Sequence, residues 1–216
     1  RGRQYATVIQ QFINTIVYAI GSVICALLIK AMPSYFCAKY KTRLGKVLYA
    51  IVIVTMILPI VGAMPATIVV MRKLNLYNKF LGIILYNSSF TGIYFLVFYA
   101  AFKALPDTYA EAARMDGAGH FVIFFKIYLP LIVPNLFAVG VMLFISFWND
   151  YQTPLVYLPS HPTISYGLYR FTRTSRSANA PALMSACLMV GLPMVVMFAI
   201  CKNAILNNIT EGGIKG

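Results

Sequence analysis

Residues 105–134 read LPDTYAEAARMDGAGHFVIFFKIYLPLIVP, the one long polar interruption in a strongly apolar chain. Three of the chain's five carboxylates lie in this stretch: Asp107, Glu111 and Asp116. Pro106 suits the first turn of a helix, where its missing N–H is no loss, and Gly117 supplies a stop. A second short helix is expected over 120–128. The pattern predicts a helix–turn–helix hairpin between two apolar segments, at the surface of a membrane.

The first helix of this hairpin has the features of a docking element. Tyr109, Ala112 and Ala113 fall at i, i+3 and i+4, which predicts one small face that another protein can approach closely. Glu111 and Arg114 can pair with each other or across an interface. We therefore expect a soluble partner to dock on the hairpin.

The composition around the hairpin is that of a polytopic membrane protein. Hydrophobic residues make up 60% of the 216 residues, charged residues only 11%, and the mean hydropathy is +0.77. These values lie far outside those of soluble globular domains. The net charge of +13 comes from 18 Lys and Arg that are scattered between apolar runs and form no continuous basic face. We interpret them as membrane-flanking charges and expect no nucleic-acid partner.

Five segments are long and apolar enough to cross a bilayer, which takes roughly 20 helical residues. We predict spans at approximately 9–38, 47–71, 80–103, 129–150 and 179–202, with the hairpin at 105–130 between the third and the fourth. The transmembrane domain then covers 9–205, after an extracytoplasmic N-terminal end at 1–8 and before a cytoplasmic tail at 206–216.

Prolines and glycines modify this pattern of spans. Pro59, Gly62 and Pro65 in the second span, and Gly191 and Pro193 in the last, predict kinks or local unwinding. A further uncharged run at 151–169 contains three prolines, so we predict a loop there.

Lys and Arg indicate the orientation, because they are enriched in cytoplasmic loops. The first connection carries Lys39, Lys41, Arg43 and Lys46, which places it in the cytoplasm. Alternation then puts the hairpin and the C-terminus inside, and the 151–176 loop outside. A chain with five spans and its C-terminus inside begins outside, which fits the loss of one preceding span. The charge bias is shallow, since two outside loops carry three positive charges each.

The spacing inside the hairpin is specific. A Glu-Ala-Ala triplet at 111–113 is followed at fixed intervals by Gly117, Ile127, Leu129 and Pro130. This spacing resembles the EAA loop of the membrane-spanning subunits of binding-protein-dependent ABC importers. Motifs along the rest of the chain resemble the carbohydrate-uptake branch, most closely the maltose-type permease: Asn14-Thr15, Trp148-Asn149-Asp150, TISYGL at 163–168, Leu192-Pro193 and ITEGGIKG at 209–216.

The resemblance implies an all-α polytopic helix bundle, the type I ABC importer permease, with five transmembrane helices visible and a cytoplasmic coupling hairpin. Such permeases usually have six spans. It also implies a place in the bacterial cell membrane and four kinds of partner: cytoplasmic ABC ATPase subunits, a second permease subunit, an extracytoplasmic sugar-binding protein and the lipid bilayer. The residues implied in ATPase coupling are Glu111, Ala112, Ala113, Arg114, Asp116, Gly117, Ile127, Leu129 and Pro130.

No catalytic or metal-binding set stands out in the sequence. His120 and His161 fall on opposite predicted sides of the membrane, and the cysteines stand singly. A glycine-rich phosphate loop is missing, so ATP and Mg²⁺ are expected in the partner ATPase, with no cofactor in this chain and no enzymatic activity of its own.

Two other kinds of function remain open at this stage. An ion-coupled secondary carrier would place ionisable groups in its spans, yet the uncharged runs that identify the spans, beginning with 4–29, contain none. This favours a conduit driven from outside the chain. A non-transporting membrane scaffold is the third reading.

Polar side chains within the spans are candidates for a sugar path, because sugars are held by hydrogen bonds beside aromatic faces. The candidates are Asn87, Ser88, Ser89, Thr91, Ser146 and Asn149. The alternative is that these groups hydrogen-bond between helices, as polar residues commonly do in membranes.

Overall fold

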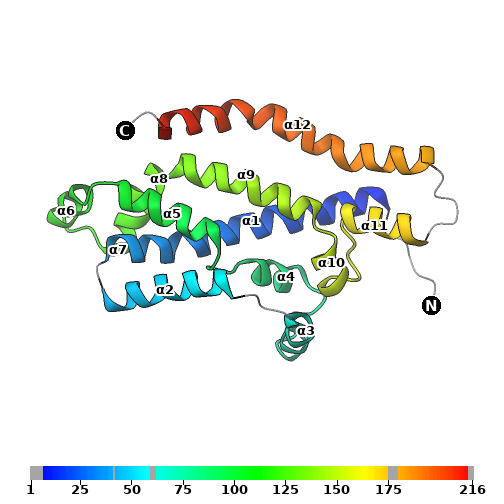
Figure 1. The fold of residues 1–216 in the computed structure, drawn as a ribbon, viewed down its shortest axis with the longest axis horizontal. Coiled ribbons are helices and arrows are strands. Elements are labelled where there is room, and N and C mark those ends of the chain that lie inside the picture. Colours follow the sequence, from blue (N-terminus) through cyan, green and yellow to red (C-terminus); the bar gives the residue numbers. More distant parts are fainter. Residues whose placement is uncertain (1–6, 41, 59–61, 175–179, 214–216) are drawn as a thin grey trace. The chain divides into compact units, whose positions relative to one another are not determined.

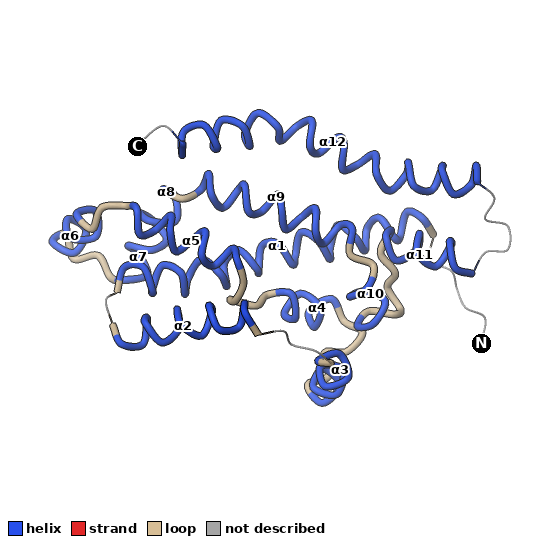
Figure 2. The backbone as a smooth tube through the Cα atoms, in the orientation of Figure 1, coloured by secondary structure: helices blue, strands red, loops and turns tan. Residues whose placement is uncertain are grey.

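The computed structural model describes residues 7–40, 42–58, 62–174 and 180–213, and the described part of the chain is helical with no strand (Figures 1 and 2). The helices are α1 (Val8–Lys39), α2 (Arg43–Ile57), α3 (Ala63–Lys73), α4 (Phe80–Asn87), α5 (Ile93–Ala104), α6 (Thr108–Met115), α7 (His120–Ile123), the π-helical turn η1 (Phe124–Tyr128), α8 (Leu129–Leu131), α9 (Val133–Asn149), α10 (Gln152–Tyr157), α11 (Ile164–Thr174) and α12 (Ala180–Gly213). The predicted all-α class is confirmed. Parts of the predicted end segments, 1–6 and 214–216, lie outside the described residues.

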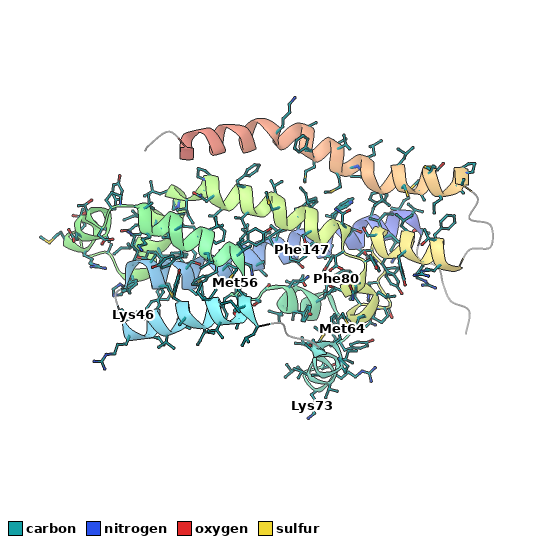
Figure 3. All side chains as sticks on the ribbon, in the orientation of Figure 1. Lys46, Met56, Met64, Lys73, Phe80 and Phe147 are labelled. Carbon is teal, nitrogen blue, oxygen red and sulfur yellow. The ribbon has the colours of Figure 1, made fainter. Side chains whose placement is uncertain are left out.

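Two of the described helices are long and apolar enough to cross a membrane by themselves: Val8–Lys39 and Ala180–Ala199. His120–Leu131 and Val133–Asn149 form a third candidate as a pair bent by 75°. The number of five spans therefore stays a prediction. Many large apolar side chains are exposed along the helices, among them Met56 and Met64 (Figure 3), as expected where lipid or another membrane subunit covers the surface.

The predicted second span, 47–71, falls on two helices. α2 ends at Ile57, and α3 begins after Gly62, whose φ of +79° is left-handed and suits glycine. The interruption expected around Gly62 is confirmed. In the last span, by contrast, α12 continues through Pro193 without a break, so the alternative of local unwinding there is wrong.

The predicted third span, 80–103, is also divided, and no feature of the sequence was interpreted as a break there. α4 ends at Asn87, residues 88–92 are non-helical, and α5 begins after Gly92. Gly92 has a φ of +104°, a conformation that side-chain-bearing residues rarely adopt.

The prediction of a loop over 151–169 is wrong, because the segment contains α10 and the first half of α11. Pro154 is the third residue of α10, within the first turn, where an N–H has no partner inside the helix. Pro159 and Pro162 lie between the two helices. The prolines thus separate two short helices and prevent neither.

The chain divides into two compact units. The first unit comprises Arg1–Ile24, Gly62–Asn87 and Met142–Gly216. Its core includes a cluster around Tyr18, Met71, Ile83, Tyr157 and Leu158 and a second cluster around Trp148, Ile164 and Val190.

The second unit comprises Cys25–Val61 and Ser88–Val141 and contains the whole hairpin. Its core is aromatic. The Tyr35 ring lies 5.0–5.4 Å from the rings of Phe102, Phe124 and Tyr128. This cluster joins α1 and α5 to the second arm of the hairpin.

Candidate functional site

The first arm of the hairpin is α6, and it buries only its small residues. Ala110 and Ala113 are 7% and 8% exposed, whereas Glu111, Ala112 and Arg114 are exposed. A small face formed by Tyr109, Ala112 and Ala113 was expected to be open to a partner, but Ala113 is buried and does not contribute to it. Tyr109 and Ala112 are exposed, whereas α6 buries the side that carries Ala110 and Ala113. The outward side of α6 offers a carboxylate and a guanidinium one helical turn apart.

The turn after α6 has the geometry predicted for it. Gly117 has a φ of +78°. Its N–H donates to the carbonyl of Arg114 (3.0 Å), and the N–H of Ala118 donates to that of Ala113 (2.9 Å). These two bonds are the Schellman pattern that ends a helix at a left-handed glycine. Gly117 is confirmed as the stop, and Asp116 is exposed just before it.

The second arm differs from a plain helix. α7 runs for four residues and is followed by the wider π-turn η1, which lies directly before the Leu129-Pro130 pair. Pro130 has no N–H to donate to a carbonyl one turn earlier. Ile127 and Leu129 are half-buried and Pro130 is exposed, so the candidate coupling residues on this arm lie at the edge of the core.

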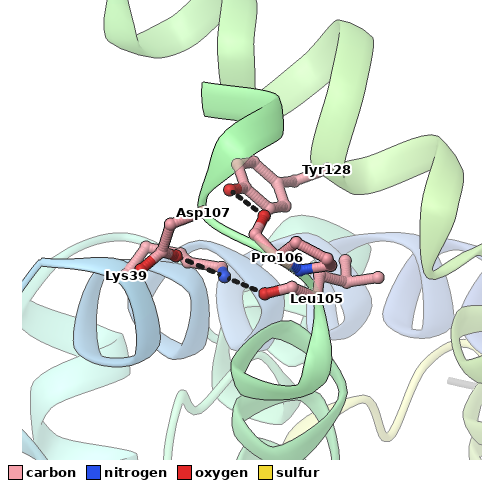
Figure 4. A network of polar contacts seen from close by, with 5 residues as sticks. All are labelled: Lys39, Leu105, Pro106, Asp107 and Tyr128. Atoms are coloured by element: carbon pink, nitrogen blue, oxygen red, sulfur yellow. Dashed lines mark hydrogen bonds and ion pairs between the residues drawn. The ribbon is translucent and has the colours of Figure 1, made fainter. Parts of the chain in front are cut away.

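The end of α1 anchors the start of α6 (Figure 4). The Lys39 ammonium donates to the Leu105 carbonyl at 2.5 Å and pairs with the Asp107 carboxylate at 2.8 Å. The Tyr128 hydroxyl donates to the Pro106 carbonyl at 3.2 Å. Three consecutive residues before α6 are thereby held by side chains from α1 and from the second arm of the hairpin.

The second arm is tied to the same end of α1. The Tyr40 hydroxyl and the Nδ1 atom of His120 lie 2.6 Å apart. The Lys39 ammonium also lies 5.0 Å from the centre of the Tyr128 ring, within cation–π range. Both arms are therefore fixed to one short segment, which we call the α1 anchor and define as Lys39 and Tyr40.

Two cavities flank this anchor. One has a volume of about 350 Å³ and is lined by charged groups from the α1 anchor and from the hairpin. Its lining residues are Lys39, Asp107, Glu111 and Arg114, together with Tyr35, Tyr40, Thr42, Ala110 and Tyr128. The other, of about 300 Å³, is lined by apolar and aromatic side chains that include Phe36, Phe121 and Phe124. The Phe121 side chain is 71% exposed. A charged hollow and an apolar hollow thus adjoin the α1 anchor.

The candidate path residues are divided between the two units. Asn87 belongs to the first unit, where its amide donates to the Tyr18 hydroxyl (3.1 Å) and the Ser22 hydroxyl (3.2 Å). This contact bears out the alternative of interhelical bonding for Asn87. Asn149 donates to the Ile145 carbonyl of its own helix at 2.9 Å, and both Asn149 and Ser146 are exposed.

The other three candidates, Ser88, Ser89 and Thr91, belong to the second unit. Ser88 is 6% exposed, whereas Ser89 is exposed and Thr91 is half-buried. The hydroxyls of Ser89 and Thr91 lie 2.8 Å apart.

The structure brings forward three residues that the sequence did not single out as site residues. Tyr18 donates to the Asp150 carboxylate at 2.8 Å, inside the network of Asn87. Lys30 lies within α1 and is 6% exposed. The uncharged runs contain no ionisable side chain, but the span predicted at 9–38 includes Lys30, which the structure buries within α1. Lys30 directly follows the uncharged run 4–29, and α1 continues past it for nine residues, in agreement with the span predicted at 9–38.

Three of the motifs that resemble the carbohydrate-uptake branch are joined in the first unit: Asn14-Thr15, Trp148-Asn149-Asp150 and 163–168. The Asn14 amide donates to the Pro162 carbonyl (3.0 Å), and the Thr15 hydroxyl accepts from the Ile164 N–H (2.8 Å). The Trp148 indole donates to the Val190 carbonyl at 3.2 Å, and its own carbonyl accepts from Ser165 at 2.5 Å. Segments far apart in the sequence are thus joined by hydrogen bonds.

Within the described residues, no group of three His, Cys, Asp or Glu side chains is placed to hold a metal ion.

Comparison with known proteins agrees with these features. Residues 30–209 match the family described as binding-protein-dependent transport system inner membrane component. The arabinooligosaccharides transport system permease protein AraQ of Halalkalibacterium halodurans is 30% identical and aligns over 95% of this chain and 74% of its own. The melibiose/raffinose/stachyose import permease protein MelC of Bacillus subtilis is 28% identical over 95% of this chain and 75% of its own.

The fold has a solved counterpart. The crystal structure of a bacterial ABC transporter involved in the import of the acidic polysaccharide alginate contains a chain that superposes with a TM-score of 0.78, at 23% sequence identity, over 93% of this chain and 76% of that one. It supports the fold of a type I ABC importer permease. The protein thus belongs to the family of binding-protein-dependent transport system inner membrane components and is a permease subunit of an ABC importer.

Proposed function

We propose that this permease subunit carries sugars and forms half of the path through the membrane, with a second permease subunit forming the other half. The names of its relatives support the substrate class, since they specify arabinooligosaccharides, melibiose, raffinose, stachyose and diacetylchitobiose. An extracytoplasmic binding protein delivers the sugar. ATP and Mg²⁺ are bound by separate cytoplasmic ATPase subunits, and this chain contributes no cofactor.

In this proposal the hairpin is the ATPase-coupling element. Its exposed side carries Glu111 and Arg114, which suit charge-assisted contacts with a soluble subunit. The charged and apolar hollows beside the α1 anchor offer places for side chains of that subunit. The hairpin and the C-terminus accordingly face the cytoplasm.

The observation that carries the proposal is the attachment of both hairpin arms to the α1 anchor. Lys39 holds the chain before α6, and Tyr40 holds His120 on the second arm. A hairpin fixed at both arms to the end of a 32-residue helix cannot move without moving that end. ATPase closure can therefore reach α1 as a rigid-body displacement, which is a common form of conformational switching.

The test is to replace Glu111 by Ala and Gly117 by Val in the assembled transporter, and to measure co-purification of the ATPase together with sugar uptake. We expect both variants to lose ATPase binding or to uncouple hydrolysis from uptake. Met115→Ala is the matched control, because Met115 lies on the same helix, is 88% exposed and belongs to none of the motif positions. Normal assembly and normal uptake in both variants would remove the coupling role.

A further inference from the structure

Lys30 is a buried cation within a helix that is long and apolar enough to cross a membrane. Its ammonium donates to the backbone carbonyl of Ser89 and, at 3.3 Å, to that of Thr91. Both of these partners are neutral backbone groups and neither is a carboxylate. Charged side chains at membrane depth are costly and generally mark functional positions.

The backbone that Lys30 holds is the non-helical segment 88–92, in the middle of the predicted third span. The helices before and after it have eight and 12 residues, so neither reaches across a bilayer alone, which takes roughly 20 residues. Non-helical backbone at membrane depth is tolerated only where it is buried in protein or lines a water-filled cavity. Lys30 satisfies two of the carbonyls that the break leaves without helical partners.

A second contact fixes the same place. The Ser34 hydroxyl, one turn after Lys30, lies 2.6 Å from the carbonyl oxygen of Lys30 and 3.0 Å from that of Phe95, so its single proton is shared between the two. Phe95 lies in the first turn of α5 and is fully buried. α1 therefore holds the end of the break with Lys30 and the start of the next helix with Ser34.

The break also carries two hydroxyl groups, on Ser89 and Thr91, besides the carbonyls that accept from Lys30. Ser89 is exposed and Thr91 is half-buried. Their hydroxyls lie 2.8 Å apart, and the Thr91 N–H donates to the Ser89 hydroxyl at 3.2 Å. Each hydroxyl can donate one hydrogen bond and accept two, so the pair retains capacity for an outside ligand. The groups are arranged for a neutral molecule rich in hydroxyls.

We propose that Ser89 and Thr91 line the water-filled transport path and hydrogen-bond to sugar hydroxyls, with Lys30 as the positioning residue that holds the unwound backbone. The assignment of the ligand rests on the proposed sugar transport. The lining of an aqueous path does not depend on it. Discontinuous membrane helices form substrate sites in other classes of transporter by the same physical means.

Access of water tests the lining directly. In a transporter whose native cysteines are replaced (Cys25, Cys37, Cys187 and Cys201), Ser89→Cys and Thr91→Cys are treated with a charged, membrane-impermeant methanethiosulfonate. The cysteine thiolate attacks the divalent sulfur of the reagent. A disulfide forms, the bond to the sulfonyl sulfur breaks, and methanesulfinate is released. Val97→Cys is the control, because Val97 is 38% exposed on the apolar helix α5. We expect both test positions to react at least about tenfold faster than the control, since thiols ionise far more readily in water than in apolar surroundings.

Equal rates at the three positions, with ATP absent and with the ATPase trapped by vanadate, would overturn the proposal. That result is expected if the segment is covered by the second permease subunit. The sugar assignment is judged separately, by uptake of labelled raffinose and arabinotriose into proteoliposomes. Fast modification without uptake of either sugar would leave the lining in place and remove the sugar as its ligand. Sugar uptake together with slow modification of Ser89→Cys and Thr91→Cys would overturn the lining of the path and leave the sugar transport in place.

The positioning role of Lys30 is tested by Lys30→Met and Lys30→Arg. We expect Met to raise the KM of uptake about three- to tenfold, the effect of a lost hydrogen-bond contact, and to change the modification rate of Ser89→Cys. Arg keeps the donors and should retain most of the wild-type KM. An unchanged KM and unchanged thiol rate with Met would overturn the role. Because Lys30→Met can fail to assemble, the double variant Ser89→Ala, Thr91→Val provides the same KM measurement with Lys30 intact, and an unchanged KM there would remove the sugar contact.

Discussion

The ammonium of Lys39 lies 2.8 Å from the carboxylate of Asp107, and the two differ sharply in burial, since the Lys39 side chain is 7% exposed and that of Asp107 is 57% exposed. The same ammonium donates to the Leu105 carbonyl. The buried partner thus makes two contacts that hold the chain before α6. The exposed Asp107 carboxylate takes part in one of these two Lys39 contacts.

This asymmetry predicts unequal effects of two substitutions. Asp107→Asn should cost only about 0–1 kcal/mol of stability, the range of exposed ion pairs, and should leave uptake nearly normal. Lys39→Met leaves the Leu105 carbonyl without its donor and frees the start of α6, so ATP hydrolysis should continue while uptake falls. The measurement is the ratio of sugar transported to ATP hydrolysed in proteoliposomes. An equal loss of coupling in both variants would contradict the anchor role of Lys39.

The turn at Gly117 predicts a graded response to side chains. A left-handed conformation costs most L-residues roughly 1–2 kcal/mol, and Asn tolerates it best. Gly117→Asn should therefore retain ATPase binding, Gly117→Ala should weaken it, and Gly117→Val should weaken it most. The binding affinity of purified ATPase for the permease in detergent gives the order. The space around Gly117 is open, so side-chain size alone should not matter. If binding fell with side-chain size, with Asn weaker than Ala, this explanation would be refuted.

The turn was predictable from the sequence because its cause is local. Gly117 follows a short amphipathic helix, and the left-handed φ depends on that residue alone. The inward side of Ala113 was not predictable in the same way. It depends on how α6 packs in the folded unit, which the sequence of the helix alone does not specify.

The break at 88–92 and the burial of Lys30 both depend on the contact between them. Neither can therefore be recognised from the sequence alone. The segment has no proline, and its apolar flanks read as a continuous span. Lys30, 59 positions before Ser89, reads as the border of an uncharged run. Only the fold brings the ammonium to the carbonyls that a broken helix leaves free. The helices in 151–169 were missed for another reason, since Pro154 is compatible with a first helical turn.

The partly buried hydrogen-bond network of the first unit predicts coupling between Tyr18 and Asp150. The Tyr18 hydroxyl donates to Asp150 and accepts from Asn87, so Tyr18→Phe removes one hydrogen bond from each. Asn87 keeps its bond to Ser22, and Asp150 keeps the one from the Thr153 N–H. Losing a typical hydrogen bond costs about 0.5–1.5 kcal/mol, and losing one to a charged group costs about 1.5–3 kcal/mol. Asp150→Asn keeps an acceptor oxygen and should cost less.

A double-mutant cycle on Tyr18→Phe and Asp150→Asn measures this coupling through thermal unfolding of the purified transporter. An interaction free energy of about 0.5–3 kcal/mol is the range for residues in direct contact. Additive effects of the two substitutions would show that the hydrogen bond contributes nothing to the stability of the unit.

Two glycines in predicted spans should respond oppositely to alanine. A Cβ on Gly82 would overlap the backbone carbonyl of Leu76, which cannot rotate away, whereas a Cβ on Gly191 would meet nothing within 4 Å. Gly82→Ala must therefore displace the connection between α3 and α4 and should lower the unfolding temperature of the transporter. Gly191→Ala should be neutral or stabilising, by up to about 1 kcal/mol, because alanine has the higher helix propensity. Unfolding followed by differential scanning fluorimetry separates the two. A similar loss in both variants would indicate that α12 packs closely at Gly191 against another subunit, and no loss at Gly82 would contradict the close approach of Leu76.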